Sequence, residues 1–393
     1  MRRPRPPLAG LLAVGLLTAC GQGTTGTDAS PGASDTHEAA ATRRPACVER
    51  VLSGMSMRER VGQLFVAGVD STHPTRVQLR QIRRHHLGGV ILMGHSSAGV
   101  AEARKVAHRL QAQATAKTTD GVRLWIAVDQ EGGYVQVLRG PGFSDIPTAL
   151  TQGGLERATL RSRAHKWAKQ LRAAGVNLNL APVVDTVPAS LGRTNKPVGY
   201  YDREYGHTPK AVAAHGVAFL EGMRSVDVQT TAKHFPGLGR VRGNTDTTYG
   251  VTDSVTTRHD AYLRPFKTAI DGGIPVVMVS SARYTEIDKR YLAPFSPVVL
   301  RGMLRHDLGF TGVIMSDDLG RAAAVKKVPV GERATRFLLS GGTVVLTVTM
   351  SAVPTMTAAV LRRAAGHPRF RAKVNAAATK VLRVKDRIGL LPC

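Results

Sequence analysis

Short apolar segments recur along this chain, and each is nearly continuous in Val, Ile and Leu. Such segments are typical of parallel β-strands that are covered on both faces, because neither face then needs polar side chains. Eight segments have this pattern, and they lie at residues 61–69, 88–93, 124–129, 176–185, 228–234, 274–281, 312–317 and 343–348.

The stretches between these segments carry apolar residues at the spacing of an α-helix. They lie at residues 78–86, 99–116, 155–174, 209–224, 257–271, 296–308 and 331–340, and two longer ones, 352–365 and 370–388, close the chain. Glycines follow three of them, at Gly175, Gly272 and Gly341, where a helix ordinarily ends. Strands and helices are therefore expected to alternate.

Eight such strand–helix units predict an α/β fold of the closed (β/α)8, or TIM-type, barrel. A doubly wound open sheet is the alternative, because it uses the same alternation. Cys47 and Cys393 lie at the two ends of the predicted folded part. Closure of a barrel brings the first and last elements side by side, so this pair of cysteines favours the barrel.

Polar residues fall where five of the predicted strands end. They are Asp129, Asp185, the pair Lys233 and His234, the pair Ser280 and Ser281, and the pair Asp317 and Asp318. Each alone is compatible with a helix cap or a surface turn. In a barrel, however, the carboxyl ends of all strands meet on one face, and the chemistry is carried there. Together the five strand ends predict one shared polar pocket.

The composition is that of an ordinary globular protein, with 42% hydrophobic and 21% charged residues among 393. The formal net charge of +26 has two interpretations. One is solubility combined with a bias toward GC-rich codons, which favours arginine; the other is attraction to anionic cell-surface polymers and phospholipid head groups. The basic residues are scattered and aromatic residues make up only 5%, which argues against nucleic-acid binding.

The N-terminal region differs from the rest. Arginines precede a short apolar run, 8–17, and small residues lead up to Cys20. This order predicts a secretory signal peptide over residues 1–19. Small residues directly before a cysteine resemble the lipobox of bacterial lipoproteins, in which Cys20 is lipidated; a plain signal peptide is the alternative. Residues 20–46 are rich in Gly, Thr, Ser and Ala and predict a flexible tether, and residues 47–393 predict a single folded domain.

Export also bears on the two remaining cysteines. An exported chain meets an oxidising compartment, in which Cys47 and Cys393 are expected to form a disulfide that joins the ends of the domain. Two unpaired thiols on frayed ends are the alternative.

Four motifs at the predicted strand ends resemble the catalytic domain of glycoside hydrolase family 3, and they occur in that family's order. They are VDQEGG at 128–133, NLAPVVD at 179–185, AKHFPG at 232–237 and SDDL at 316–319, and the opening MSMRERVGQL at 55–64 fits as well. The resemblance covers residues 51–348. In length the chain is most similar to the family's single-domain bacterial β-N-acetylhexosaminidases.

The resemblance implies a retaining mechanism with Asp317 as the nucleophile. Asp318 competes for this role, but the alternation of side chains along a strand is expected to turn it toward the following helix. The resemblance also implies that Asp129, Lys233 and His234 bind the sugar; a buried ion pair across the barrel mouth is the alternative. Arg203 follows as a candidate contact to a substrate carboxylate or N-acetyl group, with helix capping as its alternative.

The sequence departs from the branch at residues that matter for catalysis. The branch carries a catalytic histidine two residues after an aspartate. Here the residue two positions after Asp246 is Thr248, whose hydroxyl cannot donate a proton near neutral pH. Tyr134 replaces an arginine that contacts sugar. Either Asp246 is itself the acid, with a pKa raised by burial, or another group supplies the proton, or the protein binds glycans without hydrolysing them. The other candidate groups are Glu131, Glu204 and His259.

The sequence thus predicts a retaining exo-acting glycoside hydrolase, most simply a β-N-acetylglucosaminidase acting on cell-wall fragments or chitooligosaccharides, anchored by lipid to the outer face of the cell membrane. The alternatives are a catalytically silent glycan-binding lipoprotein and a β-glucosidase-type hydrolase. A lyase or aldolase using Lys233 as a Schiff-base amine is not supported by the HFPG that follows. No metal or other cofactor is expected, since no metal-ligand or phosphate-binding motif occurs.

Overall fold

The computed structural model describes residues 46–393. The predicted signal peptide at 1–19, the lipidation site Cys20 and residues 20–45 of the predicted tether lie outside the described residues. No helix within residues 46–393 is both long enough and apolar enough to cross a bilayer.

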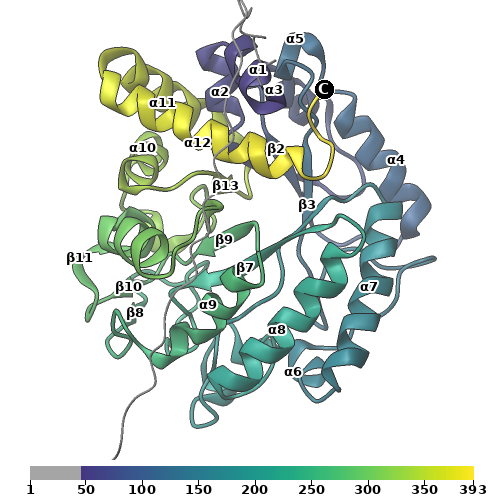
Figure 1. Cartoon of the computed structure of the whole chain (residues 1–393), viewed down its shortest axis with the longest axis vertical. Coiled ribbons are helices and arrows are strands. Elements are labelled where there is room, and N and C mark those ends of the chain that lie inside the picture. Colours follow the sequence, from purple (N-terminus) through teal and green to yellow (C-terminus); the bar gives the residue numbers. More distant parts are fainter. Residues whose placement is uncertain (1–45) are drawn as a thin grey trace, which may run out of the picture. The chain divides into compact units, whose positions relative to one another are not determined.

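Eight parallel strands form the centre of the domain (Figure 1). They are β1 (Phe65–Asp70), β2 (Gly89–Met93), β3 (Trp125–Val128), β6 (Leu178–Asn179), β7 (Gln229–Phe235), β9 (Val276–Val279), β12 (Val313–Ser316) and β13 (Val345–Thr347). Their order in space is β12-β9-β7-β6-β3-β2-β1-β13. Each strand therefore neighbours the barrel strand before it and the one after it in the sequence.

The two ends of this strand order also meet. Met315 of β12 forms a parallel bridge with Val344, just before β13. The amide of Ser316 donates to the carbonyl of Val344 at 2.9 Å, and the amide of Leu319 donates to that of Leu346 at 3.0 Å. The barrel is thus closed between its first and last strands, as the sequence predicted, and the open sheet is excluded.

Helices surround the barrel (Figure 1). They are α1 (Cys47–Gly54), α2 (Met57–Gly62), α3 (Arg76–Arg84), α4 (Gly99–Gln111), α5 (Ala116–Thr119), α6 (Ala149–Gln152), α7 (Arg157–Ala173), α8 (Pro209–Arg224), α9 (Arg264–Asp271), the π-helix η5 (Val298–Asp307), α10 (Val330–Ser340), α11 (Val353–Gly366) and α12 (Pro368–Asp386). The capping chemistry follows the sequence: Thr208 accepts a hydrogen bond from the amide of Ala211, and Pro209 opens α8. At the carboxyl end of α10, Gly341 adopts φ +114°, a conformation that favours glycine.

Several predicted boundaries were wrong; the predicted helix 99–116, for example, ends at Gln111. Three others have a clear local reason. The first two residues of the predicted strand 61–69 belong to α2, which Ser56 caps. The predicted helix 257–271 starts as a loop with a short 3-10 turn, η3 (Ala261–Leu263), before α9. The predicted strand 176–185 is paired continuously only at Leu178–Asn179, because Pro182 has no amide hydrogen to donate to a neighbouring strand.

Two small sheets lie outside the barrel. The hairpin of β4 (Gln130–Gly132) and β5 (Val135–Gln136) follows β3. A three-stranded sheet is formed by β8 (Thr252–Asp253), β10 (Arg283–Tyr284) and β11 (Asp288–Leu292). Both sheets belong to segments that follow barrel strands.

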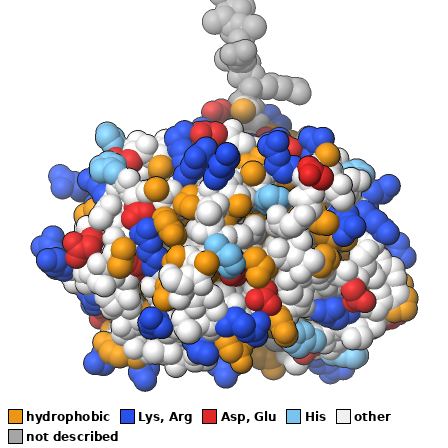
Figure 2. Space-filling model, turned by 90° about the horizontal axis from the view of Figure 1, so that it is seen from below, with side chains coloured by type: hydrophobic (Ala, Val, Ile, Leu, Met, Phe, Trp, Pro, Cys, Tyr) orange, Lys and Arg blue, Asp and Glu red, His pale blue; other side chains and the backbone are white. Residues whose placement is uncertain are grey.

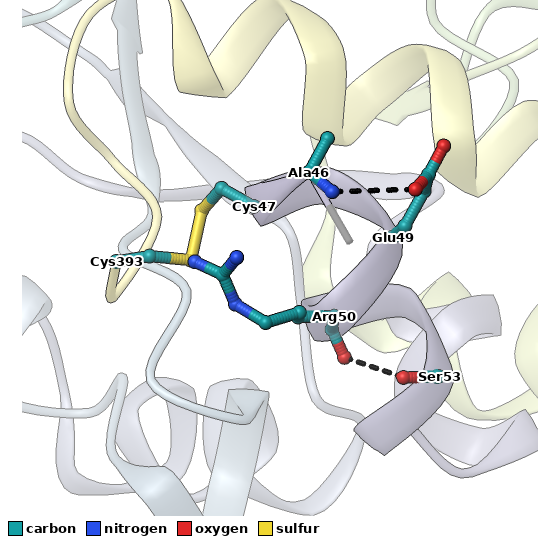
Figure 3. The surroundings of a disulfide bond; sticks show 6 residues. All are labelled: Ala46, Cys47, Glu49, Arg50, Ser53 and Cys393. Atoms are coloured by element: carbon teal, nitrogen blue, oxygen red, sulfur yellow. Dashed lines mark hydrogen bonds between the residues drawn. A yellow bond between two sulfur atoms is a disulfide. The ribbon is translucent and has the colours of Figure 1, made fainter. Parts of the chain in front are cut away.

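The first and last helices of the domain lie side by side. Val48 and Val51 of α1 pack with Leu382 of α12 in a small cluster of buried apolar side chains. Cys47 and Cys393 form a disulfide, with Cα atoms 5.9 Å apart (Figure 3). This is the pairing that the sequence suggested, and barrel closure explains why residues 346 positions apart meet.

A buried lysine lies at the opposite end of the barrel from the strand-end residues. Lys385 of α12 is fully buried. Its Nζ donates to Gln63 Oε1 at 2.7 Å and to the carbonyls of Gly88 at 2.7 Å and Arg123 at 2.9 Å. These carbonyls immediately precede β2 and β3, so Lys385 ties α12 to the amino-terminal ends of the strands.

The basic side chains are dispersed over the face of the molecule shown in Figure 2. On the face shown in Figure 2, Lys and Arg side chains are spread over the whole outline and are interleaved with acidic and apolar ones. The large positive charge of the chain therefore forms no single patch on this face.

Candidate active site

A cavity of about 570 Å³ opens at the carboxyl ends of the barrel strands. Every substrate-binding or catalytic residue predicted from the sequence lines it; these are Asp129, Tyr134, Arg203, Lys233, His234, Asp246 and Asp317. They come from five separate places in the chain. Barrel closure therefore brings all of them to one cavity. Of the five strand ends predicted to share a pocket, however, three line it; the other two end in Asp185 and in Ser280 and Ser281, which are buried and do not line it.

Four charged groups form a network on one side of this cavity. The Nζ of Lys233 lies 2.6 Å from Asp129 Oδ1 and 2.5 Å from Glu131 Oε1. Arg203 binds Glu131 with two nitrogens, Nε to Oε2 and Nη2 to Oε1, both at 2.8 Å. This two-pronged geometry fixes the planes of both groups. Glu131 is buried and binds both cations. It therefore holds Lys233 and Arg203 rigidly beside the cavity.

Glu131 is an ion-pair partner and not a proton donor. Burial alone raises the pKa of its carboxyl group, but the charges of Arg203 and Lys233 and their hydrogen bonds outweigh burial and lower the pKa to about 2. The group is therefore ionised at every pH at which the protein would work. The sequence left Glu131 open as a general acid, but its carboxylate is paired with Arg203 and Lys233 and does not line the cavity.

Asp129 presents a free oxygen to the cavity. Its Oδ1 accepts from Lys233, whereas no residue among 46–393 donates a hydrogen bond to its Oδ2. The side chain is half-buried, with 27% of it exposed. A carboxylate placed in this way accepts hydrogen bonds from hydroxyl groups of a ligand. The ion pair with Lys233 and a ligand-binding role are therefore compatible.

His234 is oriented by Asp185. Its Nδ1 lies 2.7 Å from Asp185 Oδ2, and Asp185 is fully buried. The other oxygen of Asp185 accepts from the amide of Leu238 at 2.8 Å. This contact fixes the imidazole so that Nδ1 donates and Nε2 faces Arg203 and the cavity. The peptide between Lys233 and His234 is cis.

The two consecutive aspartates after β12 differ sharply. Asp318 is buried, and its carboxylate accepts four backbone hydrogen bonds of 2.8 to 3.0 Å, from the amides of residues 320, 321, 322 and 348. Asp317 is half-buried, and one hydrogen bond to its carboxylate is seen, from the amide of Asp318 at 2.8 Å. Asp318 therefore stabilises the following loop, whereas Asp317 keeps most of its acceptor capacity for the cavity.

Asp246 lies in the loop after β7 and shares the cavity with Asp317. Asp246 is an exposed residue at the open side of the cavity, but the protein atoms around its carboxyl group exclude part of the water that would solvate it. This desolvation, followed by the negative charge of Asp317, raises its pKa to about 6. Two carboxyl groups that share a site in this way separate their ionisations, which is the arrangement found for acid and base pairs.

The loop that carries Asp246 is fastened to the loop that carries Asp317. The amides of Ala323 and Ala324 donate to the carbonyls of Asp246 and Thr245, both at 3.0 Å. Ala323 begins the short 3-10 helix η6 (Ala323–Val325). These two hydrogen bonds hold the loop of Asp246 against the segment that follows Asp317.

The remaining candidate proton donors lie outside the cavity. Glu204 is buried, and burial raises its pKa, but it does not line the cavity. His259 and Thr248 are exposed and do not line it either. Among the groups considered from the sequence, Asp246 alone lies in the cavity within residues 46–393.

Several cavity residues were not recognised from the sequence. Tyr201 lines the cavity beside Tyr134, and the exposed Arg321 lines it three residues after Asp318. Tyr200 and Tyr201 come shortly before Arg203 in the sequence, and this aromatic pair beside a predicted site residue was the available signal. Asp185 was noted at its strand end but given no role. Within residues 46–393 no group of three His, Cys, Asp or Glu side chains is arranged to hold a metal ion.

Comparisons with known proteins agree with this geometry. Residues 56–384 match the model of the glycosyl hydrolase family 3 N terminal domain. A β-hexosaminidase of Stenotrophomonas maltophilia is 33% identical over 291 residues, which are 72% of this chain and 82% of that protein. A β-N-acetylhexosaminidase structure from Beutenbergia cavernae is 46% identical with a TM-score of 0.83, covering 84% of this chain and 99% of that one. A family 3 β-N-acetylglucosaminidase structure from a Paenibacillus species is 28% identical, with a TM-score of 0.76 over 86% of this chain and 63% of that one.

Proposed function

This chain belongs to glycoside hydrolase family 3, and from that premise we propose that it is an exo-acting β-N-acetylglucosaminidase that retains anomeric configuration through Asp317 and Asp246. The glycoside hydrolase activity follows from the family match and from the similarity to β-hexosaminidases. The same comparisons favour an enzyme over a silent glycan-binding protein. The observation that carries the mechanism is the pairing of a free carboxylate with a carboxyl group of raised pKa in one cavity.

Asp317 is the proposed nucleophile. A retaining glycosidase needs an ionised carboxylate whose lone pairs are free to attack the anomeric carbon. The carboxylate of Asp317 is half-buried, accepts from the amide of Asp318 and faces the cavity. The carboxylate oxygens of its neighbour Asp318 already accept hydrogen bonds from four backbone amides and are not free to attack a substrate.

Asp246 is the proposed acid and base. With a pKa raised to about 6, it still holds its proton in slightly acidic solution and can protonate the leaving oxygen. The charge of Asp317 is one cause of that raised pKa. When Asp317 becomes an ester in the covalent intermediate, this charge disappears and the pKa of Asp246 falls. Asp246 is then a carboxylate, as the second step requires of a base that activates water.

The charged network of Asp129, Lys233 and Arg203, together with His234, binds the sugar. Asp129 offers an acceptor oxygen, Lys233 and Arg203 offer cationic donors, and His234 offers Nε2. Charge-assisted hydrogen bonds of this kind fix the orientation of a sugar ring relative to the reacting carboxylates. Because Glu131 and Asp185 already hold these groups in place, little reorganisation is needed when the sugar binds.

Hydrolysis of aryl glycosides by the purified protein tests this proposal. The expected result is faster turnover of the aryl β-N-acetylglucosaminide than of the aryl β-glucoside, and loss of turnover in Asp317→Asn. Asp318→Asn is the matched variant; it is expected to lower stability, with turnover retained by the folded fraction. Parental activity in Asp317→Asn would remove it as nucleophile, and preference for the glucoside would make the protein a β-glucosidase.

The natural substrates we propose are cell-wall fragments or chitooligosaccharides with a terminal N-acetylglucosamine, met outside the cytoplasm. The support is the sequence of residues 1–20, which reads as a signal peptide followed by Cys20, together with the disulfide between Cys47 and Cys393. A lipid on Cys20 would hold the enzyme at the outer face of the membrane. Membrane fractionation tests this: Cys20→Ser should release the protein in soluble form, and an unchanged membrane fraction would contradict lipid anchoring.

A further inference from the structure

Three tyrosines gather at one edge of the cavity, and all are exposed. The exposed fractions are 61% for Tyr134, 37% for Tyr201 and 39% for Tyr200. Tyr134 and Tyr201 also line the cavity. Exposed aromatic rings that gather at the mouth of a binding cavity commonly mark a ligand-binding surface.

The rings are arranged as a continuous surface. The centroids of Tyr134 and Tyr201 are 6.1 Å apart with their planes at 63°, and those of Tyr200 and Tyr201 are 5.0 Å apart at 82°. Tyr134 comes from the turn of the β4–β5 hairpin and the other two from η2 (Gly199–Tyr201). Two loops that are far apart in the sequence thus build one aromatic edge.

The loop of Tyr201 is held by a buried asparagine. Asn195 accepts from the amides of Val198 at 3.0 Å and Gly199 at 2.9 Å. Its Nδ2 donates to the carbonyls of Leu238 at 2.7 Å and Val241 at 2.6 Å. All the hydrogen-bonding capacity of this buried side chain is therefore used to fasten η2 to the segment that follows β7.

The turn of Tyr134 is held in a similar way. The amide of Gly133 donates to the carbonyl of Ile146 at 2.8 Å, and the carbonyl of Gly133 accepts from Arg139 Nη2 at 2.6 Å. Both loops are fixed before any ligand arrives, so a ligand that packs on these rings orders little of the protein.

We propose that Tyr134 and Tyr201 form a platform on which the second sugar ring of the substrate stacks. This inference rests on the proposed function. An exo-acting enzyme holds the terminal ring in its cavity, so the ring that reaches the edge of the cavity is the leaving-group sugar. The C–H face of a pyranose is apolar and packs on an aromatic ring, while its hydroxyl groups remain in water.

Tyr200 supports the platform from its outer side. Its ring packs edge-on against Tyr201, and Lys196 Nζ and the guanidinium of Arg193 lie 4.3 and 5.2 Å from its centroid. These cations lie against the ring of Tyr200, which does not line the cavity, so Tyr134 and Tyr201 form the aromatic surface next to it. The platform therefore selects for oligosaccharides over glycosides that lack a second ring.

Kinetics on paired substrates test the platform. We compare kcat/KM for N,N′-diacetylchitobiose with kcat/KM for methyl β-N-acetylglucosaminide, which has no second ring. Tyr134→Ala and Tyr201→Ala are each expected to lower the disaccharide-to-methyl ratio by about two- to tenfold, the range that aromatic packing ordinarily contributes. Tyr134→Phe and Tyr201→Phe keep the ring and should keep the ratio. Tyr291→Ala, an exposed tyrosine of β11 outside the cavity, is the matched control.

Two results would overturn the proposal. One is an unchanged ratio in both alanine variants; the other is a ratio that falls as far in the phenylalanine variants, which would assign the effect to the hydroxyl groups. If the unchanged protein hydrolyses neither substrate, the proposed function fails, and calorimetry still tests the platform. The alanine variants should then lose the preference for diacetylchitobiose over N-acetylglucosamine, and an unaltered preference would refute stacking.

Discussion

Replacement of Asp246 by asparagine tests whether this side chain supplies the catalytic proton. Asparagine keeps the shape of the side chain but can neither donate nor accept the catalytic proton. General acid catalysis ordinarily contributes about 10²- to 10⁴-fold in rate. We therefore expect Asp246→Asn to lower kcat/KM by that factor on a methyl or sugar glycoside, whose leaving group needs protonation, and far less on a dinitrophenyl glycoside.

The raised pKa sets the pH dependence. With a pKa of about 6, roughly nine tenths of Asp246 is protonated at pH 5 and roughly one tenth at pH 7, as follows from simple titration. An acid must be protonated to act, so kcat/KM of the parental enzyme on the methyl glycoside should fall about tenfold per pH unit above pH 6. This alkaline limb should be absent from the residual activity of Asp246→Asn.

The assay needs a control from the same loop. Thr247 also lines the cavity and does not titrate in this range, so Thr247→Val alters the loop without removing an acid and should retain the alkaline limb. Equal losses of Asp246→Asn on good and poor leaving groups, or an alkaline limb that survives the substitution, would refute the assignment of the proton to Asp246.

Three further predictions concern the supports of the site and the fold. Ala323→Pro removes the amide that donates to the carbonyl of Asp246, at the first position of a helix, where proline fits. We expect kcat to fall several-fold while the free energy of unfolding stays the same. An unaltered kcat in steady-state assays would show that this hydrogen bond is not needed for catalysis. Lys385→Met removes the donor to three oxygens. The carbonyl of Gly88 keeps the amide of Trp125 as a donor, but the buried Gln63 Oε1 loses its partner, which should lower the free energy of unfolding in urea by about 1–3 kcal/mol. The exposed Arg383→Met on the same helix should change it little; equal effects would contradict the role of Lys385. Cys47→Ser opens a link across 346 residues and should cost about 2–5 kcal/mol in the same titration, while parental stability would show that α1 and α12 hold together without it.

The barrel and most of the site could be predicted because both depend on short stretches of sequence that can be recognised one at a time. Buried parallel strands need nearly continuous apolar runs, and a barrel places the residue after each run on one face. This is why Asp129, Lys233, His234 and Asp317 meet as expected. The assignment of Asp317 over Asp318 also rested on a local rule, the alternation of side chains along a strand.

What could not be predicted depends on the contacts between loops. Glu131 is adjacent to a predicted site residue, and only its contacts with Arg203 and Lys233 make it a permanent anion. The raised pKa of Asp246 depends on how closely the loops after β7 and β12 surround it. Tyr201 reaches the cavity because Asn195 folds its loop inward. No period or motif in the sequence encodes such long-range contacts.

Trapping the covalent intermediate identifies the nucleophile. A fluorinated N-acetylglucosaminyl donor with an activated leaving group forms the glycosyl-enzyme quickly and releases it slowly, so the adduct can be located by peptide mass spectrometry. We predict one added sugar per chain, attached to Asp317, and no adduct in Asp317→Asn. An adduct on Asp318 or Asp246, or turnover of the donor with no adduct on any residue, would contradict this prediction.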